Sequence, residues 1–388
     1  MSSKPQQKTV LIVGAGFAGV PAFNEFSKRL DPDTTKLVLI NPRSHFIHLP
    51  AACRLVVSQT EPHYEDKIFL PLTDRFNEGN RRTVNAKVVS IHDDKYDEAN
   101  RYVTLDNGEK IEYTYLLLAP GSIWEGPLDF PNTKEESIKK LKEWHNRFEK
   151  ANDIVLVGGG GISFEYAGEI KDEWPTKNVT IVHSRNLLLN DVYPDRWRRQ
   201  VNESLEKRGV RLVLGDRVDD VVPKDGKIVT RSGKEITADL VIPTRGPRPN
   251  SAFIAASLGD EVLTSSGHVK VNPTMQLPDR PHIFAAGDVV EWNEQKSARK
   301  AYPQALVVVQ NILTLLKDPE ATNLKSYWGR PEALPLTNGK NGGTSYWGVL
   351  WGVTFGDWFT SFFASRKLYI PGVNRMLNLP PGSSKESS

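Results

Sequence analysis

Residues 10–19 read Val-Leu-Ile-Val-Gly-Ala-Gly-Phe-Ala-Gly, and this stretch decides the fold of the first part of the chain. The apolar residues predict a buried strand, and the G-x-G-x-x-G spacing leads into a helix predicted over residues 20–30. Gly14 permits the tight turn, Gly16 lets the backbone approach a pyrophosphate, and Gly19 lets helix and strand pack closely. The helix N-terminus then faces the phosphate charge. A glycine-rich turn without a ligand is the alternative.

The chain repeats this device, which favours the ligand-binding interpretation. Residues 153–157 form a second apolar strand, followed by Gly158, Gly160 and Gly161 and by an amphipathic helix. Ser163 stands at the place of the third glycine and is small enough for close packing. Two such turns predict two dinucleotides, of which we expect one to be a bound flavin and the other an exchanging nicotinamide.

The composition is that of an ordinary globular protein. A chain of 388 residues suffices for two or three domains, and a net charge of +3 gives no sign of nucleic-acid binding. Cys53 is the only cysteine, which excludes a disulfide framework, a CxxC redox pair and a cysteine-based zinc or iron–sulfur site. We expect no bound metal.

The ends and the hydropathy suggest a location. The first strand begins near Thr9, so we expect neither a signal nor a transit peptide, and Ser2 excludes N-myristoylation. No run is long enough to span a bilayer. We therefore expect a cytoplasmic protein, with membrane surfaces such as the lipid droplet or the mitochondrial outer face as the alternative.

Both units lack the acidic residue that usually ends the second strand and binds a ribose. Asn41 follows the strand predicted over residues 36–40, and its amide can still bond a hydroxyl. In the second unit His183, Ser184 and Arg185 end the strand, and Arg185 could accept a 2′-phosphate. We expect NADPH and NADH both to bind, and an exposed turn without discrimination is the alternative.

Later segments return the chain to the first unit. We predict a strand over residues 111–118 that ends near Gly121, and a β meander from residues 211–222, 227–230 and 235–243. Another strand ends in Gly287-Asp288, where Asp288 can accept hydrogen bonds from a ribityl hydroxyl. The next helix begins around Tyr302, and its N-terminus would favour a reduced, anionic flavin. An ordinary packing helix is the alternative.

Four positions leave alternatives open. Arg54 lies among apolar residues and its fork matches a phosphate, although it could equally be a surface arginine. The neighbouring Cys53 is more typical of inert packing than of a reactive thiol. His45 and His48 are interpreted as structural or surface residues.

The end of the chain is rich in aromatic residues. Seven lie within residues 347–363 and are followed by Arg366 and Lys367, namely Trp347, Trp351, Phe355, Trp358, Phe359, Phe362 and Phe363. Aromatic residues beside cations suit a peripheral membrane contact. Core packing and a homodimer seam are the alternatives.

These motifs together resemble one family. The order GAGFAG, SHFIHLPAACR, APGS, GGGGISFEYAGEI, VTIVHS, TRGPRPNS, FAAGDV and KAYPQA is similar to that of the apoptosis-inducing-factor homologues, which include ferroptosis suppressor protein and the fungal AMID-like proteins. The resemblance covers nearly the whole chain. It implies an α/β fold with two Rossmann-like dinucleotide-binding domains and a small C-terminal α+β domain.

The resemblance also implies domain bounds and a reaction. Residues 1–121 and 239–315 would form a discontinuous FAD-binding domain and residues 122–238 the NAD(P)H-binding domain. Residues 316–388 would form an interface domain with a disordered end. The implied reaction passes a hydride from NAD(P)H to FAD and on to a quinone-like acceptor. A redox-sensing effector with low turnover is the runner-up, and a flavin monooxygenase is a third interpretation.

Residue roles follow from the resemblance in the same way. The turn Gly14-Ala15-Gly16-Phe17-Ala18 would hold the FAD pyrophosphate. Arg54 would contact FAD, Val88 would lie near its adenine, Asp288 would bind its ribityl chain, and Glu165 would be the acid beside the nicotinamide.

This chain departs from the family at four places. Asn41 replaces an aspartate, Pro120 and Arg245 interrupt two Thr-Gly turns, and Ala364 replaces a lysine. If the missing lysine assists acceptor chemistry in the relatives, we expect a different acceptor choice here.

Overall fold

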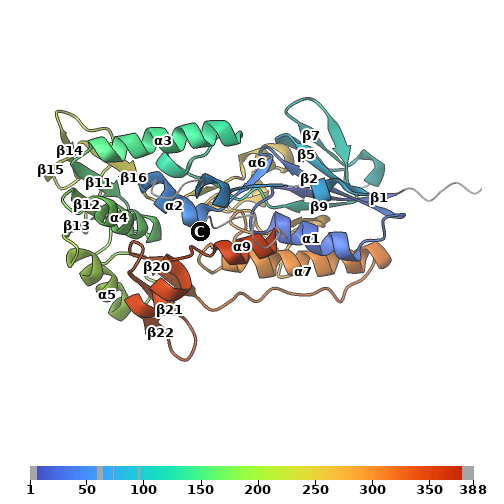
Figure 1. Cartoon of the computed structure of the whole chain (residues 1–388). Helices are drawn as coiled ribbons and strands as arrows, with labels where there is room; N and C mark the ends of the chain where they lie inside the picture. The colour runs from blue at the N-terminus through green and yellow to red at the C-terminus, as the bar shows by residue number, and fades with distance from the viewer. Residues whose placement is uncertain (1–6, 59–63, 73, 95–96, 378–388) are drawn as a thin grey trace, which may run out of the picture.

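The computed structural model describes residues 7–58, 64–72, 74–94 and 97–377. The predictions for Ser2 and for the disordered chain end from residue 380 lie outside the described residues. Two sheets of mainly parallel strands lie side by side, and the C-terminal segment packs beneath their junction (Figure 1).

The first sheet has six strands, and the strand that enters the first glycine turn lies near its centre. β1 pairs in parallel with β2 on one side and with β9 on the other. In sheet order the strands are β18 (Gln276–Leu277), β19 (Arg280–Ala285), β9 (Tyr115–Leu118), β1 (Lys8–Val13), β2 (Thr35–Asn41) and β5 (Arg81–Asn85).

Helices α1 (Gly19–Arg29) and α7 (Ala298–Lys317) pack together along this sheet (Figure 1). Their apolar sides are fully buried at Phe26 and Ile312, which are 0% exposed. A small antiparallel sheet of β6 (Val88–His92), β7 (Tyr102–Leu105) and β8 (Lys110–Glu112) accompanies α6 (Ala252–Leu258). These elements place the first glycine turn at the carboxyl end of buried β1, between the parallel strands β2 and β9.

The strand predicted over residues 111–118 is wrong as a single element, since it divides into β8 and β9. The break lies at Tyr113 and Thr114, whose side chains form hydrogen bonds with residues outside these two strands. The Tyr113 hydroxyl donates to Asp93 at 3.0 Å, and Thr114 Oγ1 accepts from the Thr9 amide at 3.1 Å. The two halves then join different sheets.

The second sheet has four parallel strands in the order β13, β12, β11 and β16. Their bounds are Val210–Leu214, Asn178–His183, Asp153–Val157 and Leu240–Pro243. Helices α3 (Lys134–Lys150), α4 (Gly161–Glu173) and α5 (Asp195–Glu206) flank this sheet (Figure 1).

The predicted β meander is wrong. β13 pairs with β12, β16 pairs with β11, and only β14 (Lys227–Val229) and β15 (Glu235–Thr237) form a hairpin. The apolar strand β16 lies in register with β11, opposite Ile154–Val157. The second unit therefore extends to Pro243, and the boundary expected at residue 238 is too early.

The C-terminal segment contacts both units. An antiparallel sheet of β20 (Ala333–Thr337), β21 (Gly343–Trp347) and β22 (Val353–Phe355) leads into α8 (Asp357–Thr360), a π turn over Ser361–Ser365, and α9 (Ile370–Met376). A Cβ on Gly168 of α4 would lie 2.7 Å from the Gly339 amide nitrogen. Asn24 of α1 donates to the carbonyl of Met376 at 2.7 Å.

Short pieces complete the fold. They are α2 (Leu49–Val57), the paired strands β3 (His45–Ile47) and β4 (Phe69–Pro71), and the paired strands β10 (Ser122–Ile123) and β17 (Arg248–Pro249).

Candidate active site

In the first glycine turn, one glycine has room for a side chain and two do not. A Cβ on Gly14, whose φ is +102°, would lie 2.1 Å from the Ala119 carbonyl oxygen, and a Cβ on Gly19 would lie 1.8 Å from that of Gly14. A Cβ on Gly16 would meet nothing within 4 Å. The fold itself therefore requires Gly14 and Gly19. Gly16 leaves open space beside the turn, where a phosphate fits.

Asn41 holds the backbone of this turn by hydrogen bonds. Its Oδ1 accepts from the Ala15 amide at 3.1 Å, and its Nδ2 donates to the Arg43 carbonyl at 2.6 Å. The amide side chain thus fixes the backbone of the turn, a role that sequence reasoning missed. Its contact with a ribose stays a prediction.

The strand-end aspartate lies near the first turn. Ser122 donates to Asp288 Oδ2 at 2.7 Å, and a Cβ on Gly287 would lie 3.3 Å from the Ala18 side chain. The Gly287 amide donates to Gln304 of α7 at 2.7 Å. The structure thus brings together the glycine turn, the Gly-Asp turn and the beginning of α7.

Three further predicted contacts have clear positions. Gly121 has a φ of +69° with open space around it, Val88 is buried at the start of β6, and Tyr302 is exposed near the beginning of α7. Their contacts with FAD stay predictions.

The second glycine turn repeats the pattern of the first. A Cβ on Gly158 would lie 2.5 Å from the Thr244 carbonyl oxygen, whereas a Cβ on Gly160 would meet nothing within 4 Å. A Cβ on Gly161 would touch Leu336 at 3.1 Å. Ser163 is buried and donates to the Gly160 carbonyl at 2.7 Å, so the serine fits the place of the third glycine.

His183 supports the second turn. Its Nδ1 accepts from the Gly159 amide at 3.0 Å, which leaves Nε2–H to donate to the Leu189 carbonyl at 3.2 Å. Burial lowers the pKa of His183, in keeping with this neutral form. Ser184 and Arg185 follow it at the surface, and Arg185 pairs with Asp191 at 3.4 Å. Their contacts with a nucleotide stay predictions.

Glu165 lies one turn into α4, half-buried under the C-terminal segment. Its Oε1 accepts from the amide and the hydroxyl of Thr337, at 3.3 and 3.2 Å. Burial raises the pKa of Glu165 to about 7, against the opposing effect of these two bonds. A carboxyl with this pKa exchanges a proton near neutral pH.

Arg54 is buried in an ion pair, which was not anticipated. Its Nε donates to both oxygens of Glu169 at 2.9 Å, and its Nη1 donates to the Ser365 carbonyl at 2.7 Å. Nη2 lies 2.8 Å from Glu169 Oε1 and 3.3 Å from the Gly339 carbonyl oxygen. The surface alternative for Arg54 is therefore wrong. Its fork holds a carboxylate here, and a contact with FAD stays a prediction.

Cys53 lies beside this pair and is 2% exposed. Burial raises the pKa of the thiol well above its ordinary value, and the carboxylates of Glu165 and Glu169 add to the effect. The interpretation of Cys53 as inert packing agrees with this environment.

His48 is a site residue that sequence reasoning set aside. Its Nε2 lies 2.6 Å from the Leu368 carbonyl oxygen, and burial lowers its pKa to about 4. The ring is therefore neutral with Nε2–H as the donor. Its buried Nδ1 has no partner among the described residues, and the ring packs edge-on against Phe17 at 6.2 Å. The lone pair of His48 Nδ1 can accept a hydrogen bond from an N–H or O–H group beside the first turn, and FAD carries such groups.

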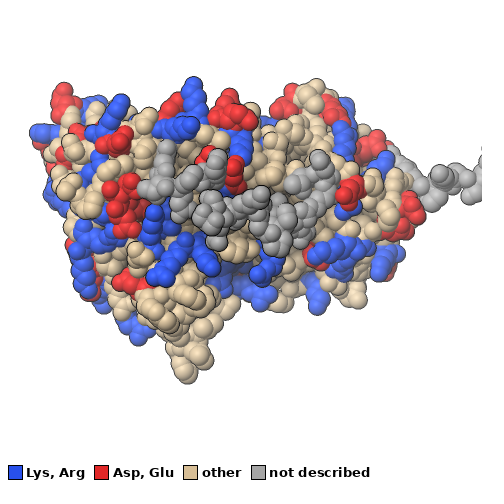
Figure 2. Space-filling view, in the orientation of Figure 1, with Lys and Arg blue, Asp and Glu red and all other residues tan. Residues whose placement is uncertain are grey.

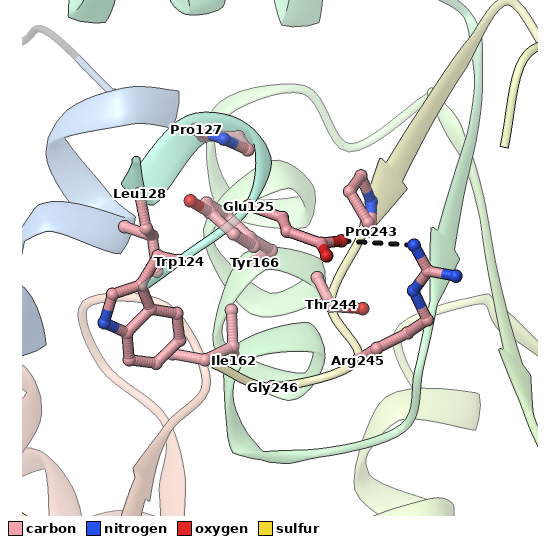
Figure 3. A pocket seen from close by; sticks show the side chains of 10 residues that line it. All are labelled: Trp124, Glu125, Pro127, Leu128, Ile162, Tyr166, Pro243, Thr244, Arg245 and Gly246. Atoms are coloured by element: carbon pink, nitrogen blue, oxygen red, sulfur yellow. Dashed lines mark hydrogen bonds and ion pairs between the residues drawn. The ribbon is translucent and has the colours of Figure 1, made fainter. Parts of the chain in front are cut away.

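A small pocket, partly open to solvent, lies beside the second turn (Figure 3). Ile162 and Tyr166 of α4 form one wall, Trp124–Leu128 another, and Pro243–Gly246 a third. Glu125 and Arg245 face each other across it and form an ion pair at 3.1 Å (Figure 3).

The aromatic C-terminal residues lie at the surface. Four of the seven are exposed and three, Trp347, Phe355 and Phe359, are half-buried, so core packing is wrong for the exposed four. We define the aromatic patch as five exposed residues of this segment, Leu350, Trp351, Trp358, Phe362 and Phe363. Trp351 and Trp358 are 101% and 82% exposed. Figure 2 shows the segment as an uncharged protrusion with basic side chains beside it. Among the described residues, no helix is long and apolar enough to cross a membrane.

The chain is similar to known proteins in sequence and in fold. The chain is 42% identical to an FAD-dependent oxidoreductase, FVFD30, of Flammulina velutipes over 310 residues, which cover 80% of this chain and 95% of the relative. It is 33% identical to ferroptosis suppressor protein 1 of Taeniopygia guttata, over 86% of this chain and 87% of the relative. The sulfide:quinone oxidoreductase of Aquifex aeolicus has a similar fold, with a TM-score of 0.74, 20% identity, and coverage of 96% and 92%.

Two glycine turns, each at the end of a strand in a mainly parallel sheet, are the arrangement of a flavoprotein that binds two dinucleotides. The chain belongs to the pyridine nucleotide-disulphide oxidoreductase family, whose profile matches residues 8–305. It is an FAD- and NAD(P)H-dependent oxidoreductase. The resemblance to apoptosis-inducing-factor homologues and the predicted fold class are thereby confirmed.

Proposed function

We propose that this enzyme passes a hydride from NADPH or NADH by way of FAD to a quinone-like acceptor. The observation that carries the proposal is Glu165, a half-buried acid with a pKa of about 7 between the second glycine turn and the C-terminal segment. The only cysteine is buried Cys53, so this chain offers no dithiol as the acceptor. An organic acceptor that takes two electrons and two protons fits these residues.

The residues have distinct tasks in this scheme. FAD, when bound, supplies the acceptance and release of the electrons. Gly16 and Gly160 give the two pyrophosphates room, and Asp288 with His48 orients the flavin portion. Glu165 holds a proton that a reduced acceptor needs, because NAD(P)H carries one hydride and reduction of a quinone consumes one further proton.

The test is anaerobic reduction followed by an acceptor. NADPH should bleach the flavin absorbance of the purified protein, and a soluble quinone should restore it through many cycles. A redox-sensing effector would stop after one reduction. If the flavin bleaches and no quinone reoxidises it, the acceptor part of the proposal fails.

Nucleotide choice provides the first prediction. No acid ends β12, and exposed Ser184 follows it, so nothing at this position repels a 2′-phosphate. Ser184→Glu should weaken NADPH binding by roughly 1–3 kcal/mol through repulsion of like charges, while NADH binding changes little. The measurement is the dissociation constant of each nucleotide from anaerobic flavin reduction, with Ser184→Gln as the uncharged control. Equal losses for both nucleotides would show that Ser184 does not face the ribose.

Delivery of a lipophilic acceptor provides the second prediction. We infer that the aromatic patch contacts a membrane surface, with the exposed cations Arg366 and Lys367 contributing about 1 kcal/mol each on anionic lipid. Wild type should float with liposomes, more completely when they contain anionic lipid. Trp358→Ser/Phe362→Ser should remain folded and stay at the bottom of the gradient.

The alternative is that a second copy of the chain covers the patch in a homodimer. In that case wild type would not float, and the same double variant would change the sedimentation coefficient instead. A substitution of exposed Trp328, which lies outside the patch, is the matched control for general loss of surface tryptophan.

A further inference from the structure

The ion pair across the second pocket is exposed and therefore easily exchanged. The side chains of Arg245 and Glu125 are 47% and 39% exposed, and their atoms lie 3.1 Å apart. Pairs of this kind contribute little to folding stability because water screens both charges. Its position, rather than its strength, points to a role.

The backbone of Arg245 lies against the second glycine turn. Thr244 donates from Oγ1 to the Gly158 carbonyl at 2.8 Å, and a Cβ on Gly158 would lie 2.8 Å from the Arg245 amide nitrogen. The next residue, Gly246, has a φ of +95° and no neighbour within 4 Å of its Cβ position. The backbone before Arg245 is thus fixed against the turn, and open space follows it.

Glu125 comes from the connection between the two units. It belongs to the wall formed by the 124–128 segment, and Ile162 lies in α4 directly after the turn (Figure 3). The ion pair therefore spans the pocket beside the turn where a pyrophosphate is expected. The guanidinium fork binds two phosphate oxygens as readily as one carboxylate, and the N-terminus of α4 attracts the same anion.

We propose that the Glu125–Arg245 pair is a latch across the nicotinamide-nucleotide pocket, and that Arg245 exchanges Glu125 for the pyrophosphate of NAD(P)H. The inference rests on the proposed entry of NAD(P)H at the second glycine turn. It makes Arg245 a binding residue and Glu125 its competitor. Substitutions of the two partners then have opposite effects on affinity, which a merely structural ion pair would not produce.

The test is anaerobic stopped-flow reduction of the holoenzyme with NADPH and with NADH. Arg245→Ala should raise the dissociation constant of both nucleotides about tenfold, because both carry the pyrophosphate, without changing the limiting rate of flavin reduction. Glu125→Gln should lower both constants about two- to threefold by freeing Arg245. Arg248→Ala removes a neighbouring exposed cation outside the pocket and should change neither constant.

Three outcomes would overturn the latch. Weaker binding in Glu125→Gln would show that Glu125 assists the nucleotide, and a loss in Arg245→Ala limited to NADPH would place Arg245 at the 2′-phosphate. Unchanged constants in both variants would leave the pair as a surface contact. Wild type serves as the internal check on the proposed function, since its flavin must bleach before any of these comparisons is made.

Discussion

Gly16→Val should yield folded protein that contains almost no FAD. A Cβ at residue 16 would meet nothing within 4 Å, so we expect the fold to accept a side chain there. The same side chain occupies the space in which the pyrophosphate approaches the backbone. We expect FAD affinity to fall by roughly 3 kcal/mol, which is more than a hundredfold. The measurements are the ratio of flavin to protein absorbance and the far-UV circular dichroism of the purified variant.

Two other glycines provide the controls. Gly160→Val places the same side chain at the equivalent open position of the second turn, so this variant should keep FAD and lose NAD(P)H affinity. Gly19→Ala should impair folding, because its Cβ would lie 1.8 Å from the Gly14 carbonyl oxygen. Full FAD occupancy in Gly16→Val would mean that the first turn does not hold FAD.

Arg54→Ala should lower the free energy of unfolding by about 3–5 kcal/mol, because it leaves the Glu169 carboxylate buried without its partner. Glu169 is 2% exposed, and each of its oxygens lies 2.9 Å from Arg54 Nε. The alanine also removes the donors to the Ser365 and Gly339 carbonyls. Chemical denaturation followed by tryptophan fluorescence measures the loss.

The double variant Arg54→Met/Glu169→Leu separates the two tasks that Arg54 has been given. It removes both charges and keeps the volume, so most of the lost stability should return. If the double variant is stable but has lost FAD, Arg54 contacts the cofactor as the family resemblance implies. If it is stable and yellow, the ion pair is the whole role of Arg54. Stability equal to wild type in Arg54→Ala alone would contradict the buried-pair account.

Local signals in the sequence predicted the parts of the fold that depend on nearby residues. The glycine turns and α1 follow from glycine spacing and apolar period within a few residues. Strand partners do not, because a short apolar strand such as β16 fits a meander and a parallel sheet equally well. Only the pairing of Leu240 with Ile154 distinguishes the two.

The same limit applies to the site. The open positions at Gly16 and Gly160 could be predicted from the motif alone, since they depend on the local turn. Arg54 could not be paired, because Glu169 lies 115 residues further along the chain. His48 gave no signal, since its importance comes from one unpartnered nitrogen and from the carbonyl of Leu368, 320 residues away. The only indication for Arg54 was its position as a charged residue in an apolar stretch. That position predicted an anionic partner but did not identify it.

The contacts of Arg54 have a consequence for how the molecule melts. One side chain of α2 binds a carboxylate of α4 and two carbonyls of the C-terminal segment, so three separate stretches share a single buried junction. If any one of these three stretches unfolds, the charges of the ion pair become exposed to water, from which the other two stretches also help to exclude them. Calorimetry should therefore record a single endotherm with equal calorimetric and van't Hoff enthalpies, rather than successive melting of two nucleotide-binding halves.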